Sequence, residues 1–93
     1  MKHITTRKAL KELRTLCRRN GIIVTIVPKD GPGSHQGLIF EDSKTGQKIR
    51  IVIAGKKDIS PGVQRNVLKY LSEKSGNVAI AKIVKKIFES IFS

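Results

Sequence analysis

Hydrophobic residues near the start of the chain recur at intervals of three and four positions, which predicts an amphipathic helix over residues 5–20. Thr5 or Thr6 can cap its start, and Asn20-Gly21 can end it. The predicted apolar stripe consists of Ala9, Leu10, Leu13, Leu16 and Cys17.

The middle of the chain has the pattern of three strands. Residues 21–28 form a β-branched run between a glycine and a proline, and residues 35–42 and 47–54 form two more runs of strand type. The segment 29–34 is a turn cluster, and 43–46 is a short turn ending in a glycine.

The second and third strands have one self-consistent pairing, with Asp42 opposite Gln47. The predicted pairs are Glu41–Lys48, Phe40–Ile49, Ile39–Arg50, Leu38–Ile51, Gly37–Val52 and His35–Ala54. This register places the large apolar residues on one face and an opposite-charge pair on the other. His35, Gly37, Ile39, Lys48 and Arg50 are expected on the second face, which faces solvent.

Two further helices follow. The first has Ser60 as its N-cap and Pro61 at its first position, and it ends near Ser75-Gly76. The second covers residues 78–92, and Asn77 can cap its start. The order predicts an α+β fold: an α-β-β-β-α sandwich with helices on one face of a three-stranded antiparallel sheet, plus a C-terminal helix.

Composition narrows the class of protein. The 93 residues suit a single domain, 1–93, and one cysteine excludes an internal disulfide. With no apolar signal core and no stretch approaching a membrane span, we expect a soluble, cytoplasmic protein without membrane contact.

The charge points to a polyanionic partner. Lys and Arg number 19 against 7 acidic residues, giving a net charge of +12. Nucleic acid is the first candidate, and an anionic membrane surface or acidic protein competes with it. Few aromatic residues argue against a platform for stacking many single-stranded bases.

Three motifs in order resemble the HicA-type toxins, small mRNA interferases of toxin–antitoxin pairs. These are the helix ending in Asn20-Gly21, the triplet Gly33-Ser34-His35 at the head of a strand, and the segment DISPGVQRNVLKYL. The resemblance covers residues 5–76 and implies a fold like that of the double-stranded-RNA-binding domain. It also implies RNA cleavage with His35 as the catalytic residue, and a HicB-like antitoxin as partner. Residues 77–93 extend beyond the usual family length, which suggests an added function or interface such as a homodimer.

Cleavage of RNA without a metal needs a proton acceptor, a proton donor and positive charge for the phosphate. An imidazole can serve as acid or base near neutral pH, so His35 is the candidate catalytic group. The candidate RNA-binding residues are Gly33, Ser34, Lys48, Arg50, Lys56 and Lys57. No His, Cys and Asp spacing suggests a metal site, and no cofactor is expected.

Plainer interpretations stay open. His35 can be an exposed strand-edge residue without a task, the nearby glycines can serve turn geometry alone, and Lys56-Lys57 can be a solvated turn. Two other functions compete with the nuclease: a non-catalytic RNA-binding module of the same fold, and a protein-interaction subunit that uses the C-terminal helix.

Overall fold

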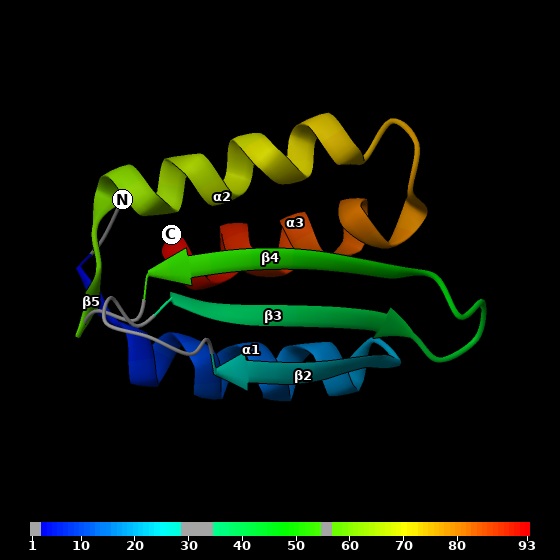
Figure 1. Cartoon of the computed structure of the whole chain (residues 1–93), viewed down its shortest axis with the longest axis horizontal. Coiled ribbons are helices and arrows are strands. Elements are labelled where there is room, and N and C mark those ends of the chain that lie inside the picture. Colours follow the sequence, from blue (N-terminus) through cyan, green and yellow to red (C-terminus); the bar gives the residue numbers. More distant parts are fainter. Residues whose placement is uncertain (1–2, 29–34, 55–56) are drawn as a thin grey trace.

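The computed structural model describes residues 3–28, 35–54 and 57–93, which form a three-stranded sheet and three helices (Figure 1). The elements are β1 (Ile4–Thr5), α1 (Thr6–Arg19), β2 (Ile22–Pro28), β3 (His35–Asp42), β4 (Lys48–Ala54), β5 (Asp58–Ile59), α2 (Pro61–Lys74) and α3 (Ala79–Phe92). The predicted α+β class is confirmed.

The main sheet has the strand order β2-β3-β4, and both pairings are antiparallel. The predicted β3–β4 register is confirmed at every pair, from Glu41 opposite Lys48 to His35 opposite Ala54. The turn between them is closed by the Asp42 amide, which donates to the Gln47 carbonyl at 2.9 Å, while Gly46 takes a φ of 75°. Glycine suits that left-handed position because it has no Cβ.

The first two helices begin and end at the residues that the sequence indicates. Thr5 accepts a hydrogen bond from the Lys8 amide, and Ser60 accepts one from the Val63 amide. Gly21 follows α1 with a φ of 71°. The predicted cap of α3 is wrong: Val78 occupies the N-cap position, in an extended conformation and without a side-chain hydrogen bond.

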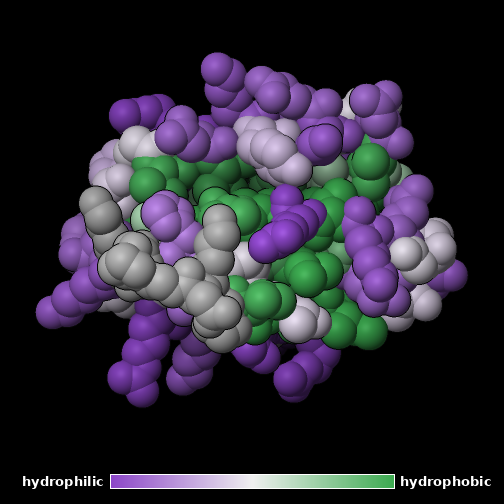
Figure 2. All heavy atoms as spheres, in the orientation of Figure 1, coloured by the Kyte–Doolittle hydropathy of each residue, from purple (hydrophilic) through white to green (hydrophobic). Residues whose placement is uncertain are grey.

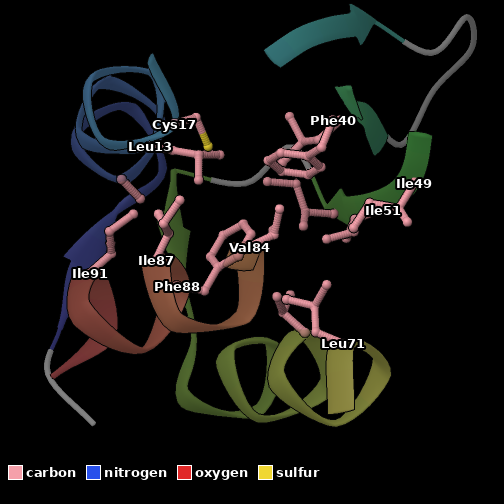
Figure 3. Packing of buried hydrophobic residues seen from close by; sticks show 14 of the residues in the cluster. Leu13, Cys17, Phe40, Ile49, Ile51, Leu71, Val84, Ile87, Phe88 and Ile91 are labelled. Atoms are coloured by element: carbon pink, nitrogen blue, oxygen red, sulfur yellow. The ribbon is translucent and has the colours of Figure 1, made fainter. Parts of the chain in front are cut away.

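The helices lie on one side of the sheet, and α3 packs between α1 and α2 (Figures 1 and 3). Seven residues of α3 are buried: Ile80, Ala81, Val84, Ile87, Phe88, Ile91 and Phe92. Phe88 meets the ring of Phe40 from β3 edge to face at 6.0 Å, and the ring of Phe92 at 5.4 Å. The apolar stripe of the C-terminal helix is therefore part of this chain's own core.

A short antiparallel bridge, which the sequence pattern did not reveal, joins the start of the chain to the segment before α2. Ile4 of β1 lies opposite Ile59 of β5, and both side chains are buried. The His3 imidazole lies 3.3 Å from the Asp58 carboxylate, and the Thr6 amide donates to the Lys57 carbonyl at 2.8 Å. These contacts hold the segment just before α2 against the start of the chain.

Candidate functional site

One face of the main sheet is not covered by helices, and it is partly apolar. Ile23, Val27 and Val52 are 55%, 37% and 44% exposed there, whereas Leu38 and Phe40 on the opposite face are fully buried. Figure 2 views this side and shows hydrophobic surface bordered by hydrophilic side chains. The uncovered face thus offers both apolar contact area and polar groups.

His35 opens β3 at one end of the uncovered face, and its side chain is exposed. It pairs with Ala54, the last residue of β4. Because side chains alternate between the two faces along a strand, the side chain of His35 lies on the face opposite to Leu38 and Phe40. The imidazole is therefore accessible to a ligand that approaches the sheet.

The guanidinium of Arg50 lies across the backbone of Gly37. A Cβ placed on Gly37 would stand 3.4 Å from both Nε and Nη2 of Arg50, in contact with the guanidinium, so a larger side chain there would compete with it for space. Gly37 is two residues from His35 on the same face, a separation of about 7 Å. A cation and an imidazole therefore share this end of the sheet.

A recess of about 820 Å³ lies between β4 and α2. Its lining consists of His35, Arg50, Ile51, Val52, Ile53, Ala54, Val63, Asn66, Val67 and Tyr70. Hydrophobic side chains form much of its surface between α2, at the top of Figure 2, and the sheet. The candidate catalytic residue and the neighbouring cation thus border one concave site.

The outer edge of β4 faces this recess. Asp42 and Gln47 form a hydrogen-bonded pair, so alternation along the hairpin points the backbone amide and carbonyl groups of Arg50 and Val52 away from β3. Tyr70 Oη donates to the Arg50 carbonyl at 3.2 Å. This hydrogen bond joins α2 to that edge.

The other predicted binding residues are dispersed. Lys48 lies 3.8 Å from Glu41 at the turn end of the hairpin, about 20 Å along β4 from the residue opposite His35. Lys57 is exposed just before β5. Gly33, Ser34 and Lys56 lie outside the described residues.

Asn66 and Tyr70 are two site residues that sequence reasoning missed. They lie one turn apart on α2 and face the recess together with Val63 and Val67. The signal available in the sequence was a pair of polar-tipped residues with i, i+4 spacing beside the apolar stripe. That signal gains meaning only once the position of α2 relative to β4 is known.

Positive charge is concentrated on the helices rather than on the sheet. The three helices carry twelve Lys and Arg residues against three acidic residues. Strands β3 and β4 carry two basic residues against two acidic ones, and β2 carries no charged residue. The surface that attracts a polyanion most strongly is therefore formed by the helices.

Cys17 contributes no exposed chemistry. Its side chain is fully buried in the core, and burial raises the pKa of the thiol to about 12. Among the described residues, no three His, Cys, Asp or Glu side chains gather closely enough to hold a metal ion. No described helix combines the length and apolarity needed to cross a membrane.

No protein-family model, curated protein or solved structure matches this chain. The resemblance to the HicA-type toxins therefore stays a prediction.

Proposed function

We propose that this protein is a HicA-like endoribonuclease that cleaves mRNA, with His35 as general acid or base. The observation that carries the proposal is that the exposed His35 side chain and Arg50 both border the recess between β4 and α2. An imidazole, a cation and a concave surface are components that phosphodiester cleavage uses.

The reaction follows from what these groups can donate and accept. His35 removes the proton from a ribose 2′-hydroxyl, and the 2′-oxygen forms a bond to the adjacent phosphorus. The bond from phosphorus to the 5′-oxygen breaks, that oxygen takes a proton from a water molecule, and His35 returns its own proton to the solvent. The products are a 2′,3′-cyclic phosphate and a 5′-hydroxyl. Arg50 donates hydrogen bonds to the phosphate oxygens as negative charge accumulates.

The charge on the helices supports RNA as the substrate class. A net charge of +12 accelerates the encounter with a polyanion, and most of the binding energy for nucleic acid comes from such phosphate contacts. Because the sheet itself is close to neutral, an RNA strand is expected to contact both the basic helices and the recess.

The test is cleavage of RNA by the protein and by its His35→Ala variant. The variant should cut about 10²–10⁴-fold more slowly, with unchanged RNA affinity and thermal unfolding. His3→Ala is the matched control, since it removes the chain's other histidine, which pairs with Asp58 at the β1–β5 bridge. Cleavage should persist in EDTA and stop at a site that carries a 2′-deoxyribose. A His35→Ala protein that cuts at the normal rate would rule the proposal out.

The location of the charge favours a second candidate, an RNA-binding module without catalysis. If the helices alone bind RNA, affinity should fall steeply with salt while no cleavage products form and His35→Ala changes nothing. The partner expected from the HicA resemblance, a HicB-like antitoxin, belongs to the first candidate. A small acidic protein encoded next to this chain would favour the toxin.

A further inference from the structure

We propose that the recess between β4 and α2 binds one unstacked nucleobase of the RNA, beside the phosphate that Arg50 holds. This inference rests on the proposed function, because it assigns the substrate's flanking base to the same site. Nothing in the sequence pattern assigned a role to Asn66, Tyr70 or the edge of β4.

The walls of the recess suit a planar ligand with apolar faces. Val52, Val63 and Val67 line it, and Val52 is 44% exposed, so its side chain is available for contact. The volume of about 820 Å³ lies within the range of small-molecule sites, which combine apolar walls with a few polar groups. A base that unstacks from its neighbours in single-stranded RNA can bury its faces against such walls.

Polar groups around the recess can read the edge of a base. The side-chain amide of Asn66 supplies two donors and one acceptor, and the outward amide and carbonyl of Val52 supply one of each. Single-stranded RNA is recognised largely through hydrogen bonds to base edges of this kind. The two groups come from the two walls of the same recess, β4 and α2.

Tyr70 limits what else can enter. Its hydroxyl bonds to the Arg50 carbonyl, and its ring lies 5.6 Å from Lys74 Nζ. An extended peptide adding to the β4 edge would need that carbonyl, so the tyrosine blocks continuous strand pairing. Beyond it, the outward backbone groups of β4 within the described residues are those of Val52 and Ala54, which fits a base better than a strand.

The position of the recess connects base binding to the cut. Val52 lies opposite Gly37, on which the Arg50 guanidinium rests, and His35 borders the same recess. A base held at Val52 therefore keeps its own ribose and phosphate near the imidazole and the guanidinium. The recess selects which linkage in the strand is presented for cleavage.

The test is an amide NMR titration of the full chain with the four nucleoside 5′-monophosphates and with ribose 5-phosphate. Nucleotides should shift the Val52 amide and the Asn66 side-chain amide in a saturable way, with one base binding more tightly than the others. Ribose 5-phosphate should shift signals near Arg50 and His35 alone. Asn66→Leu should weaken nucleotide binding about tenfold without changing the ribose 5-phosphate response, and should alter the preferred base at the cleavage site.

Asn77→Leu is the matched control, since it changes an exposed asparagine outside the recess. The proposal is overturned if no nucleotide shifts Val52 and Asn66, if ribose 5-phosphate shifts them equally, or if an acidic peptide shifts them where nucleotides do not. Failure of the nuclease proposal looks different: nucleotides still bind in the recess, but His35→Ala leaves cleavage unchanged. If His35→Ala loses cleavage but no nucleotide shifts the Val52 and Asn66 signals according to its base, the recess proposal fails and the nuclease proposal stands.

Discussion

At the scale of the residue, the absence of a side chain at Gly37 sets where a cation stands. The Arg50 guanidinium occupies the space above that glycine, 3.4 Å from where a Cβ would be. Gly37→Val should keep the fold, because valine favours strands, but should displace the guanidinium from beside His35. We expect RNA cleavage to fall at least tenfold, as for loss of one charged donor to the phosphate.

Cleavage by Gly37→Val and by Arg50→Ala should fall to a similar level, and the double variant should be no slower than either. Val27→Thr, a change on the same face that leaves Gly37 and Arg50 intact, is the control. Full activity in Gly37→Val would show that the position of Arg50 over the glycine is unimportant.

Ionisation of the buried Cys17 thiol should lower the free energy of unfolding at alkaline pH. Burial raises its folded pKa to about 12, above the value of 9.0 for an accessible thiol. The folded protein holds the proton more strongly, so the stabilisation is complete below pH 9 and is lost as the pH rises from about 9 towards about 12. The free energy of unfolding should fall by up to about 1.4 kcal/mol per pH unit in that window.

Denaturant melts of the protein and of Cys17→Ala, followed between neutral and alkaline pH, measure this effect. The variant should start less stable, since it leaves a small cavity, and should lose less stability above pH 9. Parallel pH curves for the two proteins would contradict the assignment to Cys17. A thiol reagent should label the cysteine only after unfolding.

The orientation of His35 and Arg50 could be predicted from the sequence, whereas the roles of Asn66 and Tyr70 could not. Alternation along a hairpin with a fixed turn determines which residues share a face. The recess depends instead on how far α2 stands from β4, which is a tertiary property without a local pattern.

At the scale of the element, α3 shows what periodicity does and does not reveal. The stripe of apolar residues predicted a helix correctly, but an apolar stripe has the same pattern whether it faces its own core or a partner. The structure places it between α1 and α2. Association through this helix would have to use its outward side, which carries Lys82, Lys86 and Glu89.

Phe88 tests the structural role of α3. Its ring is 2% exposed and contacts both Phe40 and Phe92. Phe88→Ala should lower the free energy of unfolding by about 3–5 kcal/mol, measured by denaturant titration. Ser90→Ala, an exposed change on the same helix, should cost less than about 0.5 kcal/mol. If the two variants unfold alike, α3 does not contribute to the core.

At the scale of the whole molecule, the segregation of charge predicts which surface governs RNA affinity. Lys11→Ala/Arg14→Ala removes two exposed charges from α1, and Lys44→Ala/Lys48→Ala removes two from the hairpin. The first pair should weaken RNA binding more and reduce the slope of log affinity against log salt by about 2. Filter binding at several salt concentrations measures both quantities. If both double variants lose the same amount of RNA affinity, the helices do not govern RNA binding.

The same segregation shifts the centre of positive charge of the described elements from the sheet towards the helices. On a negatively charged bead or chip the protein should adsorb through its helices and leave the uncovered sheet turned outward. An immobilised sample would then present the His35 side to solution uniformly, without any tag.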